Sequence, residues 1–255
     1  VLKGVEETLS AGGYGLILSH SDELYRKEID ALNVLIERRV DGILITPAQA
    51  SGDDIVALMK AHLPFVLLGR RFAGLETDYV VANDTAGAYS ATEHLIRLGH
   101  RRIVMLNGSG HISSAVERQQ GYEDALDAFA IHRDPDLVRH CAPTLESAYN
   151  TMKTVLIEQT DFSAVFCFSD LMAMGVVRAL RENGKRIPDD VSVVGFDDIE
   201  FSELLEPALT TVRVPRHRLG VEAARALLSR REGEQTLHQT VLPTELVVRK
   251  STSRV

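Results

Sequence analysis

Short apolar runs recur along the chain at intervals that favour strands alternating with helices. Each run is rich in Val, Ile, Leu or Phe, and polar or turn-forming residues follow it. This length and composition are typical of buried strands. The runs are YGLILS (14–19), DGILIT (41–46), PFVLL (64–68), RRIVMLN (101–107), SAVFCF (163–168) and VSVVGF (191–196).

Between these runs, apolar residues return at the spacing of amphipathic helices. Helices are predicted over residues 22–39, over 84–98 from a capping Asp84 to Gly99, over 170–183 from a capping Asp170 to Gly184, and over 216–231 after Pro215. Apolar strands that alternate with helices predict an α/β fold, in which helices cover both faces of parallel sheets.

Polar residues follow most of the predicted strands. Right-handed crossovers place the carboxyl ends of parallel strands on one edge of their sheet, and ligands of open α/β sheets bind outside that edge. The residues expected there are Ser19-His20, Thr46, Gly69-Arg70, Asn107, Ser169-Asp170 and Asp197-Asp198. The pattern therefore predicts a ligand crevice lined by these side chains.

Composition narrows the class of protein. The chain has 255 residues, of which 45% are apolar and 25% charged, enough for two lobes of about 100–150 residues each. Its net charge of −8 repels phosphate backbones, so the chain alone is a poor candidate for binding nucleic acid. Cys141 and Cys167 lie in or beside apolar stretches, and we interpret them as free thiols in a reducing compartment.

Sequence signatures of catalysis are absent. The chain has no phosphate-binding loop, no dinucleotide fingerprint, no nucleophile elbow, and no His or Cys spacing suited to a metal. We therefore expect no cofactor, no metal and no enzymatic activity. Polar groups at strand ends without a nucleophile favour a binding protein.

Several segments resemble the lactose- and galactose-repressor (LacI/GalR) family, in the same order along nearly the whole chain. They are RVDGILITPA (39–48), NDTAGAYSATEHLIRLGH (83–100), GHRRIVMLNG (99–108), RQQGYEDAL (118–126), the stretch 169–215 that contains SDLMAMGVVRAL and VSVVGFDD, and PTELVVRKST (243–252). No single motif decides the resemblance, which depends on their collinearity.

The resemblance implies a two-lobed fold of periplasmic-binding-protein type, with three crossing strands and a small effector between the lobes. It also implies a cytoplasmic homodimer whose effector controls the binding of helix-turn-helix domains to operator DNA. The expected lobes are residues 1–102 with 215–238 and residues 103–214 with 239–255. The DNA-binding domain and the first strand of the first lobe are expected upstream of Val1.

Three positions depart from the family pattern. Asn83-Asp84 inverts a frequent Asp-Asn pair, the position at which members often have an aromatic that stacks on the effector falls near Pro143, and Gly69 replaces an acidic residue of some members. The effector is therefore not transferred from any one relative. We expect a small polar molecule, a sugar or a sugar derivative.

Two residues are the main ligand candidates. Asp197 resembles the effector-binding aspartate at a second-lobe strand exit, where a carboxylate accepts hydrogen bonds from hydroxyls or ring N–H groups. Its alternative role is that of a turn or capping residue, which we assign to Asp198. Arg118 resembles the arginine of the RxxGY-type segment, and its alternative is a surface ion pair with Glu117.

Four further residues are weaker candidates. Ser169 occupies a strand exit, and Ser114 shares the loop that precedes Arg118. Thr46 and Arg70 stand at strand exits of the first lobe, where a structural role and a ligand contact are equally supported. Two other classes of protein remain as alternatives: a secreted sugar-binding component of a transporter, and an α/β enzyme.

Overall fold

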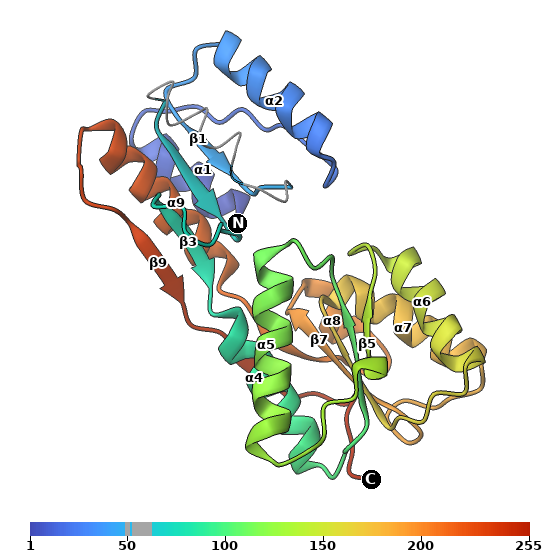
Figure 1. Cartoon of the computed structure of the whole chain (residues 1–255). Coiled ribbons are helices and arrows are strands. Elements are labelled where there is room, and N and C mark those ends of the chain that lie inside the picture. Colours follow the sequence, from blue (N-terminus) through green and yellow to red (C-terminus); the bar gives the residue numbers. More distant parts are fainter. Residues whose placement is uncertain (49–51, 53–62) are drawn as a thin grey trace. The chain divides into compact units, whose positions relative to one another are not determined.

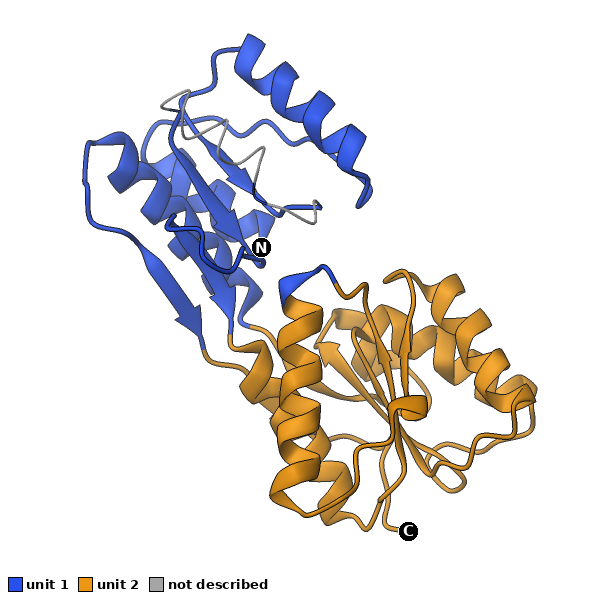
Figure 2. Cartoon of the chain, in the orientation of Figure 1, with its two compact units in different colours: residues 1–82, 111–113, 215–242 blue, residues 83–110, 114–214, 243–255 orange. Residues whose placement is uncertain are grey.

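Strands and helices alternate in a computed structural model that describes residues 1–48, 52 and 63–255. The chain forms two units, coloured separately in Figure 2. Unit 1 contains residues 1–82, 111–113 and 215–242, and unit 2 contains residues 83–110, 114–214 and 243–255. Apart from the short stretch 111–113, the chain passes between the units at Ala82–Asn83, Val214–Pro215 and Leu242–Pro243.

Unit 1 is built on a parallel sheet. Its strand order is β1-β2-β3-β9, with Leu67 opposite Tyr79 and Val80 opposite Thr240. The strands are β1 (Ile43–Ile45), β2 (Phe65–Leu68), β3 (Tyr79–Ala82) and β9 (Gln239–Leu242), and the helices of unit 1 within the described residues are α1 (Leu2–Ala11), α2 (Tyr25–Glu37) and α9 (Arg216–Arg231) (Figure 1).

Helices α1 and α9 pack closely because each has a glycine at the contact. A Cβ atom on Gly4 would lie 2.2 Å from the carbonyl oxygen of His217, and one on Gly220 would lie 2.2 Å from that of Val1. Val5, Leu9 and Ala224 form a buried cluster beside this crossing. A larger residue at either glycine would therefore force the two helices apart.

The strand predicted over YGLILS is wrong. Residues 14–20 have no regular secondary structure, and Leu16, Ile17 and Leu18 are 42%, 50% and 60% exposed. Within the described residues no strand pairs with this run, so its backbone has no ladder to join. The following helix begins at Tyr25, later than predicted, because Asp22 and Glu23 have positive φ angles of 51° and 58°.

Unit 2 is built on a larger sheet of order β10-β8-β7-β6-β4-β5, in which only β10 is antiparallel. Its strands are β4 (Ile103–Asn107), β5 (Val138–His140), β6 (Ala164–Cys167), β7 (Ser192–Asp197), β8 (Thr210–Arg213) and β10 (Glu245–Val247). Its helices are α4 (Asp84–Arg97), α5 (Ser113–Ala128), the 3-10 turn η1 (Pro135–Leu137), α6 (Leu145–Ile157), α7 (Asp170–Glu182) and α8 (Glu200–Leu204). Met105, Phe166 and Phe196 are fully buried in its core.

Two predicted helix caps are wrong by one residue. Asn83 Oδ1 accepts from the backbone N–H of Ala86 at 3.1 Å, and Ser169 Oγ accepts from that of Met172 at 3.2 Å. The caps of α4 and α7 are thus Asn83 and Ser169. Asp84 and Asp170 are the first helical residues, and both are buried.

The units divide differently from the expected lobes. Helix α4 packs against β8, β10 and β6, so residues 83–102 belong to unit 2 and not to the first lobe. Strand β9 pairs with β3, so residues 239–242 belong to unit 1. Contacts between segments that are distant in the sequence set both boundaries, and a hydrophobic pattern does not encode such contacts.

The segment after β10 is fastened to the middle of the sheet of unit 2. Ser251 Oγ donates to the carbonyl of Val193 at 2.6 Å, and the backbone N–H of Ser253 donates to Ser192 Oγ at 3.0 Å. The buried ring of His100 contacts Ser163 Oγ through Nδ1 at 2.8 Å and the Ser253 carbonyl through Nε2 at 3.1 Å. This segment is therefore part of the folded core.

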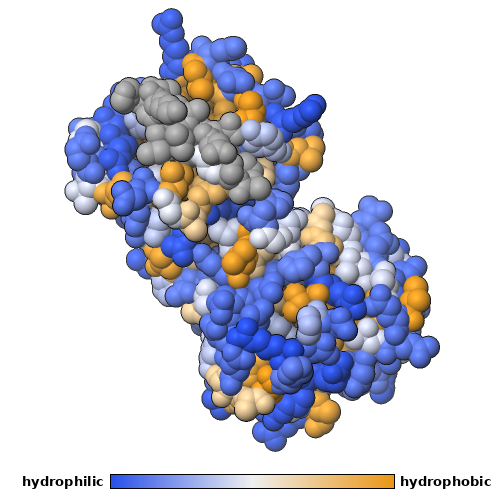
Figure 3. All heavy atoms as spheres, in the orientation of Figure 1, coloured by the Kyte–Doolittle hydropathy of each residue, from blue (hydrophilic) through white to orange (hydrophobic). Residues whose placement is uncertain are grey.

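The surface in view mixes polar residues with scattered apolar ones (Figure 3). Both cysteines are free thiols; Cys167 is buried and Cys141 is half-buried. Among the described residues, none of the helices combines the length and the apolar character needed to cross a membrane.

Candidate functional site

The exit of β7 carries two consecutive residues in an uncommon backbone conformation. Asp197 has φ 110° and Asp198 has φ 52°. Positive φ is costly for residues other than glycine and persists only where the surroundings hold it, often at ligand sites. The side chain of Asp197 is 32% exposed, so its carboxylate remains accessible.

Arg118 of α5 points toward the same strand exit from a buried position. Its guanidinium lies over the rings of Phe196 and Phe168, 3.7 and 4.4 Å from their centroids. Nε donates to Asp84 Oδ1 at 2.7 Å, and Nη1 donates to the carbonyl of Phe168. Nη2 lies 3.8 Å from Asp197 Oδ1. Arg118 is therefore a buried donor that the protein holds next to Asp197, so the alternative of a surface arginine is wrong.

Asp84 is the partner that sequence reasoning missed. The side chains of Asp84 and Arg118 are only 2% and 8% exposed, so this is a buried ion pair. Removal of one member of such a pair typically destabilises a protein by about 3–5 kcal/mol, because the other charge is left uncompensated. Nothing in the sequence links the two positions, since they belong to different helices.

Three neighbouring strands bring polar residues to this edge. Asn107 ends β4, Ser169 follows β6 and Asp197 ends β7, and these strands are adjacent in the sheet. Asn107 is buried and donates through Nδ2 to the carbonyl of Ala115 at 3.0 Å, which holds the start of α5. Ser114, in the first turn of α5, is 5% exposed.

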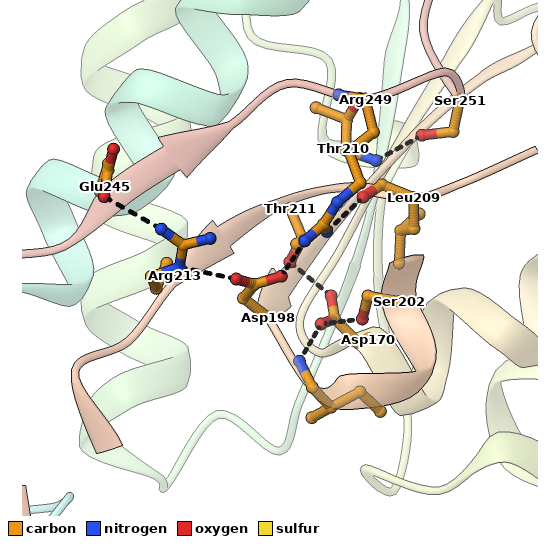
Figure 4. A network of polar contacts seen from close by, with 11 residues as sticks. Asp170, Asp198, Ser202, Leu209, Thr210, Thr211, Arg213, Glu245, Arg249 and Ser251 are labelled. Carbon is orange, nitrogen blue, oxygen red and sulfur yellow. Dashed lines mark hydrogen bonds and ion pairs between the residues drawn. The ribbon is translucent and has the colours of Figure 1, made fainter. Parts of the chain in front are cut away.

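Asp198 is not a helix cap. Its Oδ2 accepts from Arg213 Nε and its Oδ1 accepts from Arg249 Nη2, both at 2.7 Å (Figure 4). Burial alone would raise the pKa of Asp198, but the hydrogen bonds from Arg249 and Arg213 outweigh it and lower the pKa below its ordinary value. Asp198 is therefore ionised and bridges two arginines.

Asp170 fixes the backbone that follows Asp198. Its carboxylate accepts from Ser202 Oγ at 2.6 Å, from the backbone N–H of Ile199 at 2.9 Å and from Thr211 Oγ1 (Figure 4). Burial raises the pKa of Asp170, against the effect of these hydrogen bonds. A Cβ atom on Gly195 would lie 2.1 Å from Asp170 Oδ1, so this glycine leaves room for the carboxylate.

In unit 1, Thr46 and Arg70 follow the neighbouring parallel strands β1 and β2. Thr46 is exposed. Arg70 forms a bidentate pair with Glu23, through Nη1 at 2.6 Å and Nη2 at 2.8 Å, and donates from Nη1 to the carbonyl of Pro47 at 2.8 Å. Arg70 thus has a structural partner at its own strand exit.

The residues that the structure describes contain no cluster of three or more His, Cys, Asp or Glu side chains that could hold a metal ion. The side chains of Arg118 and Asp197 at the exit of β7 offer hydrogen bonding and charge. One fixed guanidinium and one accessible carboxylate stand side by side, an arrangement that can bind a ligand having both donors and acceptors.

Comparison with known proteins gives these features a context. Residues 92–252 match the family model described as a periplasmic binding protein-like domain. The HTH-type transcriptional repressor PurR of Vibrio atlanticus (strain LGP32) is 35% identical over 232 residues, which are 90% of this chain and 69% of that protein. PurR of Histophilus somni (strain 129Pt) is 33% identical over 98% of this chain and 76% of that protein.

Solved structures give the same result. The complex of the transcriptional regulator CelR with cellobiose is 35% identical, with a TM-score of 0.90 over 98% of this chain and 77% of that one. A LacI family regulator from Enterococcus faecium with bound ribose is 30% identical, with a TM-score of 0.89 over 100% of this chain and 93% of that one. Because repressors and regulator structures match it along nearly its whole length and the domain model matches residues 92–252, the chain belongs to the LacI family of transcriptional regulators and contains the periplasmic-binding-protein-like effector domain of that family.

Proposed function

We propose that the chain binds a neutral sugar or a related polyhydroxy molecule at Arg118 and Asp197, and that this binding controls the attachment of the regulator to operator DNA. The observation that carries the proposal is the meeting of these two side chains at the strained exit of β7. Support comes from the cellobiose and ribose present in two similar structures.

The local charge favours a neutral ligand. The single positive charge of Arg118 already faces the carboxylates of Asp84 and Asp197, at 2.7 and 3.8 Å. An added phosphate or carboxylate would have to approach the carboxylate of Asp197, whereas sugar hydroxyls can donate to Asp197 and accept from Arg118. Ring N–H groups of a nucleobase can also donate to a carboxylate, so nucleobases are the competing class in the test.

Ser169 and Ser114 are proposed as further contacts from unit 2, because Ser114 lies one helical turn before Arg118 in α5 and Ser169 follows Phe168, whose carbonyl accepts from Arg118. Thr46 and Arg70 are proposed as contacts from unit 1. A ligand held by both units would bind some of their arrangements better than others, and only such differential affinity can shift a conformational equilibrium.

The regulatory output is proposed to pass to a helix-turn-helix domain outside this sequence, in a cytoplasmic homodimer. The similar proteins are named as HTH-type repressors, which supports the DNA-binding part of the proposal. The same names weigh against a secreted transport component. Since the similar proteins are regulators, we propose no enzymatic activity.

The test is a thermal-shift screen of the chain with cellobiose, ribose and a panel of nucleobases, followed by calorimetry on each ligand that raises the melting temperature. A sugar that binds wild-type protein but not Asp197→Ala supports the proposal. Binding of a nucleobase alone would replace the ligand class. Equal affinity of wild type and Asp197→Ala for the bound ligand would refute the site. Chromatographic detection of products after incubation with the bound sugar would instead indicate an enzyme.

A further inference from the structure

We propose that Asp198 is a positioning residue that links the ligand-binding aspartate, Asp197, to the chain segments through which unit 2 continues into unit 1. The inference rests on the proposed function, because it gives the ligand at Asp197 a route to the rest of the protein. It assigns Asp198 no contact with the ligand.

The first step is the double pairing of Asp198. Each of its carboxylate oxygens accepts from a different arginine, Arg213 and Arg249, at 2.7 Å. The Asp198 side chain is 9% exposed and that of Arg249 is 15% exposed, so at least this second pair is shielded from water and little screened. Figure 4 shows Asp198 between the two guanidinium groups.

The second step is the position of the two arginines. Arg213 is the last residue of β8, immediately before the passage Val214–Pro215. Its Nη1 lies 3.4 Å from Glu245 Oε2, and Glu245 opens β10 shortly after the passage Leu242–Pro243. Arg249 follows β10 and donates from Nη1 to the carbonyl of Leu209 at 2.9 Å, just before β8.

Asp198 thus fastens the two segments of unit 2 that flank these passages. The remaining passage, Ala82–Asn83, is tied to the other ligand candidate, since Arg118 pairs with Asp84. Thr244 Oγ1 also donates to the carbonyl of Asn83 at 3.2 Å, which joins the first and the last of these segments. Both ligand candidates are therefore one residue or one ion pair away from the segments that leave unit 2.

The third step is the stiffness of the turn. Asp197 and Asp198 are consecutive and both have positive φ, a conformation that persists only where the surrounding structure holds it. On the far side of Asp198, the backbone N–H of Ile199 is held by Asp170 at 2.9 Å. A displacement of Asp197 by a ligand is therefore passed to Asp198 and its arginines, because the loop after it cannot absorb the motion.

The test is hydrogen–deuterium exchange of the 255-residue chain, read by mass spectrometry in peptides covering residues 210–214 and 244–250. Asp198→Asn is compared with wild type and with Asp127→Asn, a control that removes a carboxylate from an exposed pair with Arg133. Without ligand, we expect exchange in both peptides to rise roughly tenfold in Asp198→Asn and not in the control, since the amides of a released segment open more often. Strand β4 should keep its wild-type exchange.

The same variants are then measured with cellobiose and with ribose. Wild type should bind one of these sugars and gain protection from exchange in both peptides. Asp198→Asn should bind that sugar with an affinity within about threefold of wild type, a smaller change than the tenfold that 1.4 kcal/mol represents. The variant should nevertheless lose the added protection. Full ligand-induced protection in Asp198→Asn overturns the proposal, as does unchanged exchange without ligand. If wild type binds neither sugar, the proposed ligand class fails, and the ligand-free comparison still decides whether Asp198 holds both segments.

Arg213→Gln provides a second variant in case Asp198→Asn does not fold. The Arg213 side chain is 49% exposed and Asp198 keeps its pair with Arg249, so this replacement leaves no buried charge unpaired. It should raise exchange in residues 210–214 more than in 244–250, because Asp198 keeps Arg249. Equal exchange in wild type and Arg213→Gln would contradict the role given to this pair.

Discussion

The Nη2 atom of Arg118 lies 3.8 Å from Oδ1 of Asp197, which is too long for a hydrogen bond but within the range of an ion pair. Nε and Nη1 of the same guanidinium are engaged by Asp84 and by the carbonyl of Phe168. Two nitrogen positions are therefore fixed by the protein, while the third faces a carboxylate at a separation that a hydroxyl group could bridge. This geometry underlies the first two predictions.

Asp197→Asn should weaken binding of the cognate sugar by roughly 10- to 100-fold, since a hydrogen bond to a charged group contributes about 1.5–3 kcal/mol. The variant should keep the wild-type melting temperature within a few degrees, because the side chain is partly exposed. Isothermal titration calorimetry gives the affinity. Asp189→Asn, at an exposed position of unit 2, is the matched control and should bind like wild type.

Arg118→Leu should lower the free energy of unfolding by about 3–5 kcal/mol, because the buried carboxylate of Asp84 would lose its ion pair with the Arg118 guanidinium. The double variant Asp84→Asn, Arg118→Leu should recover part of this loss. Urea denaturation of the single and double variants measures both. A double variant as unstable as the sum of the two single changes would show that the pair has no coupling energy.

Stability should fall as the pH is lowered through and below about 6.5. Burial lowers the pKa values of His94 and His100 from 6.5, so the folded state holds both rings neutral. The unfolded chain binds protons at a higher pH than the folded chain does, so acidification favours unfolding over that range. Melting temperatures from pH 7.5 to 5.5 should fall more steeply for wild type than for His100→Gln. Parallel curves would remove His100 from this account.

Gly220→Ala should destabilise unit 1 by about 1–3 kcal/mol, the usual cost of an overpacked contact. The added methyl would lie 2.2 Å from the carbonyl oxygen of Val1, so α1 would have to move away from α9. Gly15→Ala is the control, because no atom lies within 4 Å of its added methyl. Calorimetric melting of the two variants should separate them by several degrees, whereas equal melting temperatures would contradict the close contact.

The alternation of strands and helices, and with it the parallel sheets, could be predicted because the apolar runs of the sheets are buried on both faces. The two lobes are expected from the chain length and from the family resemblance. Runs such as SAVFCF and VSVVGF became β6 and β7. YGLILS has the same composition but no pairing partner within the described residues, and the sequence pattern does not encode partners. The position of Asp197 at the sheet edge could also be predicted, because it directly follows the apolar run that became β7.

The supporting contacts of the site could not be predicted. Asp84 meets Arg118, and Asp198 meets Arg249, across 34 and 51 residues of chain. No local spacing distinguishes these aspartates from helix caps, which are the commoner use of an Asp before an apolar helix. Only the packing of α4 against α5, and of β10 beside β8, brings the partners together.

The fastening of Ser251 and Ser253 to β7 has a consequence for how the protein is made. Ribosomes deliver a chain from its amino end, and each domain generally folds once its own residues have emerged. Here the sheet of unit 1 needs β9, and the central strand of unit 2 needs the segment after β10, both of which are translated after all the other strands that they join. Neither sheet can be completed early, so nascent chains carry two unfinished sheets together until β9 and residues 251–253 have been translated.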